Sequence, residues 1–342
     1  MKNIKLYGFV LGAALLQSCS TAKNFSYEGK GFQEAYDGIT LEELKENLYI
    51  IAADDMQGRE TGSAGQKKAG LYMIEQYKKN GIGFPKALGS YYQKVPSEAM
   101  KKYGETLPDS ENILAFIEGS EKPEEIVVIS AHYDHVGVDK NGVIFNGADD
   151  DGSGTVAVME IAEAFQEAKK KGFGPKRSIL FLHVTGEEHG LFGSEYYSDN
   201  PVFPLANTVV DLNIDMIGRD DRENRGKQYV YVIGSEMLSS ELKKINEAAN
   251  QKSVNLELNY KYDDPKDPQR LYYRSDHYNF AKHNIPVAFY FDGIHEDYHK
   301  PTDDADKIDY PLLQKRTQFI FATAWELANR AERIKVDGKN DR

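Results

Sequence analysis

Apolar runs of strand length alternate with amphipathic segments of helical length along most of the chain. The expected strands cover residues 112–119, 124–134, 177–188, 208–218, 228–235 and 285–293. The expected helices cover residues 40–58, 62–81, 154–172, 239–251 and 309–334. Strands that are apolar along their whole length are buried on both faces. The alternation therefore predicts an α/β fold, a three-layer sandwich in which helices cover both faces of a central mixed, mostly parallel sheet.

Capping residues mark the starts of three of these helices. Thr40 stands before the first, and Ser63 stands near the start of the second. The helix at 239–251 is expected to begin at a serine cap, because a side-chain oxygen there can accept a hydrogen bond from the first free N–H groups.

The N-terminus has the order of a secretion signal. Lys2 and Lys5 precede an apolar run over residues 6–16, which is followed by "LQSC". The run is too short to span a membrane. It resembles a bacterial lipoprotein signal, cleaved before Cys19 and lipidated on that thiol, with ordinary signal cleavage as the alternative. We therefore expect residues 1–25 to be signal and tether, residues 26–342 to form a single domain, and the protein to be an extracytoplasmic, membrane-anchored lipoprotein.

Charge and cysteine content exclude several classes of protein. The formal net charge is -12, which argues against a nucleic-acid partner. The single cysteine rules out an internal disulfide framework. The chain is long enough to bury one large core.

Polar clusters follow the expected strands at their carboxyl ends, where ligands bind in sheets of this kind. They contain His132, Asp134, Glu187, Glu188, Asp215 and His299, with the run "GADDDGSG" at 147–154 between the strand at 124–134 and the next helix. Imidazole nitrogen with carboxylate oxygen is a ligand set for zinc or a similar divalent ion. Because too many acids converge for one four-coordinate ion, the pattern favours two ions that share a bridging carboxylate.

The triple aspartate at 149–151 needs something to offset its like charges. A metal cation would do so, and the N-terminus of the following helix would help. A calcium loop is the main alternative, but calcium loops use alternating acids with a distant glutamate, and both histidines would then have no role.

With these motifs in this order, the chain resembles the two-zinc exopeptidase family that includes secreted bacterial leucyl aminopeptidases and aminopeptidase Y, to which the glutaminyl cyclases are related. The resemblance covers residues 40–335. The segment "DDMQGRETGSAGQKKAG" at 54–70 is similar to the family's N-terminal signature, which carries no chemistry.

The resemblance implies a role for each matching residue. Glu187 would be the general base, and the peptide bond after the bridging aspartate, Asp150–Asp151, would be cis. The implied metal ligands are His132, Asp150 as the bridge, Glu188, Asp215 and His299.

Four further residues are candidates for supporting roles. Asp134 lies two residues after His132 on one strand face and is expected to accept that ring's N–H. Tyr298 is a candidate donor to the scissile carbonyl oxygen, with a packed aromatic as the alternative. Asp276 is expected beside the ligands, and Arg274 is a candidate contact for a substrate carboxylate. A helix cap at Ser275 with ordinary surface charges explains that segment equally well.

The expected reaction is hydrolysis of N-terminal peptide bonds in peptides with a free N-terminus, by an aminopeptidase with two Zn²⁺ ions. A one-zinc glutaminyl-peptide cyclotransferase is the alternative enzyme, although cyclases usually carry a shorter acid run. A non-catalytic binding lipoprotein is the third possibility, but such a protein would be expected to lose ligands, and all of them are present here.

Overall fold

A computed structural model describes residues 27, 29–102, 105–264 and 266–339. An eight-stranded sheet runs through its centre in the order β1-β4-β6-β5-β7-β10-β8-β9. The strands are β1 (Tyr92–Val95), β4 (Ser110–Ile117), β5 (Lys122–His132), β6 (Arg177–Val184), β7 (Thr208–Ile214), β8 (Tyr229–Ile233), β9 (Glu257–Asn259) and β10 (Val287–Phe291). Two further short strands, β2 (Lys101–Lys102) and β3 (Glu105–Thr106), pair with each other.

The four central strands, β6, β5, β7 and β10, are parallel to one another, and β6 and β10 pair antiparallel with β4 and β8 on the two sides. Their carboxyl ends therefore meet at one rim. This confirms the predicted three-layer α/β fold with a mixed, mostly parallel sheet.

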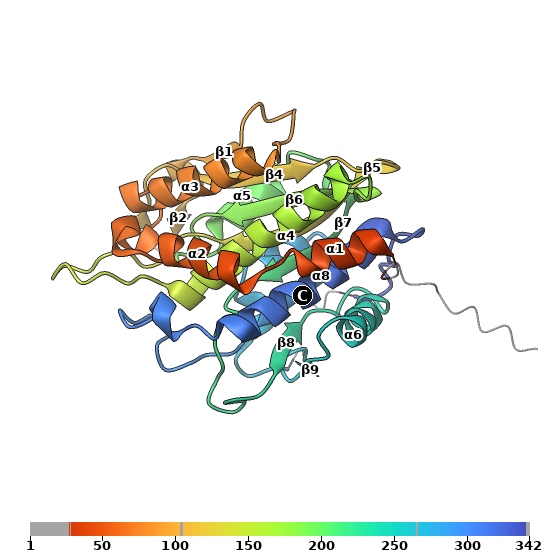
Figure 1. Cartoon of the computed structure of the whole chain (residues 1–342). Coiled ribbons are helices and arrows are strands. Elements are labelled where there is room, and N and C mark those ends of the chain that lie inside the picture. Colours follow the sequence, from red (N-terminus) through yellow and green to blue (C-terminus); the bar gives the residue numbers. More distant parts are fainter. Residues whose placement is uncertain (1–26, 28, 103–104, 265, 340–342) are drawn as a thin grey trace, which may run out of the picture.

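Helices lie on both faces of the sheet (Figure 1). One layer contains α1 (Lys30–Asp37), α2 (Leu41–Ile51), α3 (Ala64–Asn80), α4 (Gly154–Lys170), α6 (Leu242–Lys252) and α8 (Tyr310–Asn329). The opposite layer contains α5 (Phe192–Asp199) and α7 (His277–Ala281). The short α1, α5 and α7 were not among the predicted helices.

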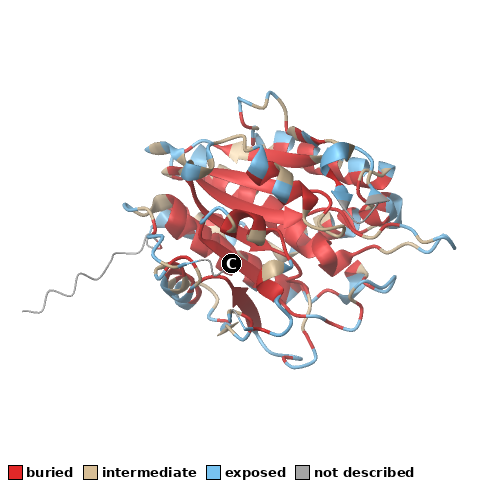
Figure 2. Cartoon of the chain, turned by 180° about the vertical axis from the view of Figure 1, so that it is seen from behind, coloured by how far each residue is buried: buried red, intermediate tan, exposed pale blue. Residues whose placement is uncertain are grey.

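Successive residues of each central strand enter different cores, because side chains alternate across a sheet. On β5, Val127 and Ile129 pack with the larger helical layer, whereas Ile126 and Val128 pack with the smaller one. The central strands are buried along almost their whole length (Figure 2). Two-sided burial explains why these strands read as continuous apolar runs.

The helix starts agree with the expected caps in two of three cases. The side-chain oxygens of Thr40 and Ser63 accept hydrogen bonds from the backbone at the starts of α2 and α3. The predicted serine cap of α6 is wrong, because that helix begins after Glu241 without a side-chain cap. The hydroxyl of Ser239 instead accepts from the backbone N–H of Glu241, because Ser239 lies before the N-cap position that Glu241 occupies.

The predicted lipidation site, Cys19, lies outside the described residues. In the described part of the chain, no helix combines the length and the hydropathy that a membrane crossing would require.

Candidate metal centre

Four neighbouring strands and one turn bring the predicted ligands to the same rim of the sheet. His132 is the last residue of β5, Glu187 and Glu188 follow β6, and Asp215 follows β7. His299 lies in the segment after β10 and is 38% exposed, and Asp150 lies in the turn that leads into α4. Residues that are far apart in the sequence therefore meet where parallel strands end.

Asp150 lies between two histidines. Its Oδ1 is 3.3 Å from Nε2 of His132, and its Oδ2 is 3.0 Å from Nε2 of His299. On the first side, Oδ1 of Asp215 is 3.6 Å from Nε2 of His132. On the second side, Oε2 of Glu188 is 2.9 Å from Nε2 of His299. Each carboxylate oxygen of Asp150 therefore faces its own pair of potential metal ligands, one histidine and one carboxylate.

These spacings fit two cations. Ligand atoms about 2.1 Å from one tetrahedral ion lie roughly 3.4 Å from each other. Among the described residues, Nε2 of His132 and Oδ2 of Asp150 are buried without a hydrogen-bond partner. Buried polar atoms normally have a partner, and a divalent ion on each side of Asp150 would supply it.

Two tight groups of potential ligand atoms lie within 4.8 Å at this rim, and they overlap the predicted set without matching it. One group is His132, Asp151 and Asp215, and the other is His135, Asp150 and Glu188. Oδ1 of Asp151 already accepts hydrogen bonds from the backbone N–H groups of Gly154 and Met216, at 2.9 and 3.1 Å. We therefore assign Asp151 to holding the turn. The peptide bond Asp150–Asp151 is cis, as the resemblance implied.

His135 is a site residue that the sequence analysis missed. Its ring is fully buried, and its Nδ1–H donates to Oε1 of Glu188 at 2.8 Å. Nδ1 is 3.8 Å from Oδ2 of Asp150, farther than Nε2 of His299. His135 thus orients Glu188, while His299 faces both carboxylates. The signal was present in the sequence, since "HYDH" places a second histidine three residues after the first.

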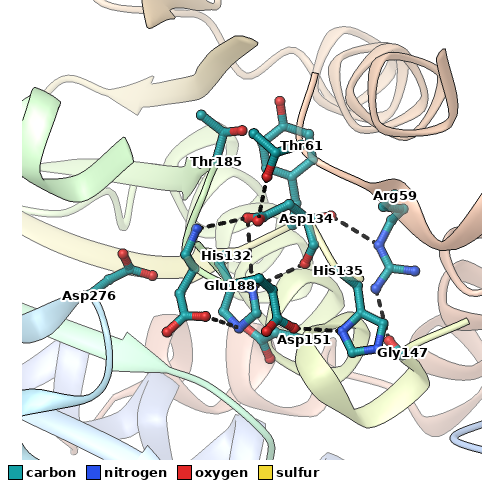
Figure 3. A network of polar contacts seen from close by, with 12 residues as sticks. Arg59, Thr61, His132, Asp134, His135, Gly147, Asp151, Thr185, Glu188 and Asp276 are labelled. Atoms are coloured by element: carbon teal, nitrogen blue, oxygen red, sulfur yellow. Dashed lines mark hydrogen bonds and ion pairs between the residues drawn. The ribbon is translucent and has the colours of Figure 1, made fainter. Parts of the chain in front are cut away.

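Asp134 supports the site through different atoms from those predicted. Its backbone carbonyl, 3.1 Å away, accepts from Nδ1 of His132, whereas its carboxylate is 3.9 Å from that nitrogen. The expected carboxylate–imidazole bond is therefore wrong. The carboxylate accepts from the hydroxyl of Thr61 and from the backbone N–H of Glu187 (Figure 3). Asp134 thus positions the segment that carries the predicted base.

Arg59 explains the N-terminal signature. It is fully buried, and its guanidinium donates to the backbone carbonyls of Ile51, Tyr133, Asn146 and Gly147 (Figure 3). These carbonyls come from α2, from the end of β5 and from the turn before Asp150. One side chain therefore ties three segments together beneath the rim, which agrees with a structural role for this motif.

The turn that carries Asp150 is held by a second layer of acids. The carboxylate of Asp303 accepts from the backbone N–H groups of Asp149 and Asp150, and Oδ1 of Asp149 accepts from Gly218. Gly147 has φ 55°, and a Cβ there would lie 2.3 Å from the carbonyl oxygen of Asp150. This position therefore requires glycine, both for its conformation and for the close approach of the backbone.

Burial and neighbouring charge set the acidity of the remaining groups. Burial, together with Asp215 and Glu188, raises the pKa of Glu187 well above its usual value, although His132 opposes the shift. Burial also raises the pKa of Asp276 to about 7. Asp276 accepts a hydrogen bond from Ser194 at 2.5 Å, and it lies beside the candidate metal centre (Figure 3).

A small pocket, partly open to solvent, adjoins the candidate metal centre. Its polar residues include Asp150, Glu187 and Asp215, with Tyr298 and Arg274 also in its wall. The rest of the wall is apolar and contains Met216, Leu271, Phe289, Phe291 and Ile294. Tyr298 stacks on the ring of His299 with centroids 3.9 Å apart and also lines the pocket.

Known proteins with similar sequences are peptidases. The sequence model of peptidase family M28 matches residues 112–324. A probable glutamate carboxypeptidase of Arabidopsis thaliana is 35% identical over 114 residues, which are 33% of this chain and 16% of that protein. The matched part of the chain therefore spans only 16% of the length of this curated relative.

Solved structures with a similar fold include proteins of different activity. The LapA aminopeptidase of Legionella pneumophila has a TM-score of 0.69 at 18% identity, over 97% of this chain and 81% of that one. A glutaminyl cyclase of Bacteroides thetaiotaomicron has a TM-score of 0.64 at 17% identity, over 84% and 98% of the two chains. At these identities the likeness supports the fold alone.

Proposed function

Because the chain belongs to peptidase family M28, we propose that it is a zinc-dependent exopeptidase that removes residues from the free N-termini of peptides. The observation that carries this proposal is the position of Asp150, whose two carboxylate oxygens face His132 on one side and His299 on the other. A carboxylate in that position suits a pair of ions, and paired ions are common in hydrolytic sites.

The ligand sets follow from the contacts that Asp150 makes in the structure. His132, Asp150 and Asp215 would hold one ion, and Asp150, Glu188 and His299 would hold the other. When bound, two such ions would polarise the scissile carbonyl and lower the pKa of a water toward neutrality.

Glu187 is the residue proposed to move the proton. It lines the pocket beside Asp150 and Asp215, and its backbone is fixed by the hydrogen bond to Asp134. A carboxylate there can take a proton from water and pass it to the leaving amine. Tyr298 lines the same pocket and is the proposed donor to the carbonyl oxygen.

The substrate is proposed from the character of the pocket. Its apolar wall suits a side chain, and its carboxylates suit the positive charge of a free α-amino group. Cyclotransfer and non-catalytic binding remain the alternatives, but a complete set of acids and histidines favours hydrolysis.

We also propose that the protein is a lipoprotein anchored through Cys19 outside the cytoplasm, on the strength of the N-terminal sequence alone.

A matched panel of peptides tests the function. It contains one peptide with a free N-terminus, the same peptide with an acetylated N-terminus, and the same peptide starting with glutamine. We expect the zinc-loaded protein to release the first residue from the free peptide only, and a chelator to abolish this release. Loss of ammonia from the glutamine peptide without residue release would favour the cyclase. Cleavage of the acetylated peptide from its C-terminus would show a carboxypeptidase, and no reaction at all would leave a binding protein.

A further inference from the structure

His299 lies in a tight turn that begins at Asp297. The backbone N–H of Lys300 donates to the carbonyl of Asp297 at 2.9 Å, so that Tyr298 and His299 are the two central residues of this turn. His299 has φ 54°, a left-handed conformation that residues other than glycine rarely adopt. Such a conformation persists where surrounding contacts hold it in place. The contacts of Asp297 are therefore important for the position of the imidazole.

Three donors meet at the buried carboxylate of Asp297. Its Oδ1 accepts from the hydroxyl of Thr302 at 2.5 Å and from Nζ of Lys307 at 2.8 Å, and its Oδ2 accepts from the guanidinium of Arg219 at 3.0 Å. The side chains of Asp297 and Arg219 are only 11% and 12% exposed. Charge-assisted hydrogen bonds are stronger than neutral ones, and removal of one partner would leave a buried charge unpaired. The carboxylate is therefore a firm anchor for the first residue of the turn.

Arg219 connects this anchor to the strand end that carries Asp215. It follows Asp215 by four residues, in the segment after β7. Its backbone carbonyl accepts from Nη1 of the fully buried Arg316 at 2.6 Å, which fixes this segment from within the core. The ion pair between Arg219 and Asp297 then joins the segment to the turn of His299. One contact therefore links proposed ligands of both ions.

A second ion pair joins the same two segments but lies in solvent. The guanidinium of Arg225 is 3.1 Å from Oε1 of Glu296, and the two side chains are 63% and 59% exposed. Exposed pairs of this kind contribute little, because water screens their charges and the long side chains lose entropy. Glu296 is also the immediate neighbour of Asp297, so the chain itself provides a matched control.

We propose that the ion pair between Asp297 and Arg219 positions His299 and thereby determines the affinity of the ion on the His299 side of Asp150. The inference rests on the two-ion site of the proposed function. Without the pair, the turn is free to leave its left-handed conformation, and the imidazole moves away from the carboxylates that it faces. The other ion takes no proposed ligand from this turn, so its affinity should change little.

Zinc titration of the full chain in competition with a chelator measures the affinity of each ion without any substrate. In Asp297→Ala we expect one affinity to fall by about 10–100-fold and the other to stay close to the wild-type value. An anomalous-scattering map at limiting zinc should then show the ion beside His132 alone. Arg219→Met should give the same loss, and the double variant should lose little more, because both changes remove one contact. Glu296→Gln should keep both wild-type affinities.

Two results would overturn the inference. One is an unchanged pair of affinities in Asp297→Ala. The other is an equal fall of both affinities together with lower stability of the metal-free protein in urea, which would show that Asp297 supports only the fold. If Asp297→Ala does not fold, Asp297→Asn, which can still accept from Thr302, should show a smaller loss at the same ion, and wild-type affinities in that variant would also overturn the inference.

The same measurement separates this inference from the proposed activity. A wild-type protein that binds two zinc ions but releases no residue from peptides would contradict the activity and leave the role of Asp297 intact. A wild-type protein that binds fewer than two zinc ions would contradict both.

Discussion

Carboxylates are buried in two places in this molecule, and their partners differ. At the rim of the sheet, Asp150 and Glu188 lie within 3.3 Å of imidazole nitrogens. In α4, Glu160 is 2% exposed, and the side-chain amide of Asn47 donates to it at 2.9 Å. The first place offers groups that can carry or share positive charge, whereas the second offers a neutral amide.

The acidity of the two groups follows their partners. Burial opposes ionisation of Asp150, but the imidazoles of His132 and His299 hold its pKa well below the usual value. Burial, reinforced by the charges of Glu43 and Glu163, raises the pKa of Glu160 to about 8. Burying an acid is therefore compatible with charge only where cationic partners surround it. At the rim, neighbouring histidines lower the pKa values of Asp150 and Glu188 in this way, which favours the ionised form that a metal ligand needs.

The largest effect within the rim is expected at Glu187. Glu187→Gln should retain both ions and lower kcat by about 10²–10⁴-fold, because Gln cannot accept the proton. Its neighbour provides the matched control, since Glu188→Gln removes a ligand and should lose an ion. Elemental analysis and steady-state kinetics on both variants separate the two roles. Wild-type turnover by Glu187→Gln would remove Glu187 from proton transfer.

A smaller effect is expected at His135. Its substitution tests whether this residue orients a metal ligand or is a ligand itself. His135→Ala removes the donor to Glu188 and should weaken binding of the ion on that side by about 10–100-fold, as loss of such orienting contacts usually does. Competition with a zinc chelator measures this affinity. His189→Ala is the matched control, because that histidine pairs with Glu60 instead. Equal affinities for His135→Ala and wild type would contradict the orienting role.

The smallest effect is on the stability of the fold, and it tests the second buried site, Glu160 in α4. The folded-state pKa of Glu160 is raised to about 8, above the ordinary value of 4.5. The wild-type protein is therefore fully stable with respect to this group below pH 4.5. It loses stability as the pH rises to about 8, because the folded state resists ionisation of this acid. In urea titrations at pH 8.5, the free energy of unfolding of Glu160→Gln should therefore exceed that of wild type by roughly 1–3 kcal/mol. The difference should be much smaller at pH 5. Glu167→Gln, on an exposed position of the same helix, should show no such pH-dependent gain. A destabilised Glu160→Gln at pH 8.5 would show that this acid is ionised and paired.

The central strands and the rim positions could be predicted from the sequence because both depend on local pattern. An apolar run that ends in His132 or precedes Glu187 and Glu188 marks a buried strand and its carboxyl end without knowledge of the fold. The helices α5 and α7 and the strand β9 contain eight, five and three residues, too few for a periodic pattern to be recognised. Periodicity does not reveal such elements.

The details of the site that were missed depend on atoms rather than on residues. The sequence places Asp134 on the same strand face as His132, but it does not say whether the carbonyl or the carboxylate meets the ring. His135 contacts Glu188 only because the segments that follow the neighbouring strands β5 and β6 meet at the rim. Pairings of this kind arise only when distant segments come together. The contacts of Arg59 with the carbonyls of three separate segments are another example.

Metal stoichiometry with an anomalous-scattering map tests the central claim most directly. For the full chain crystallised with zinc, we expect two ions per molecule beside Asp150, and loss of both in Asp150→Ala. A wild-type crystal grown in excess zinc with no ion beside Asp150, or full zinc content in a folded Asp150→Ala protein, would contradict it.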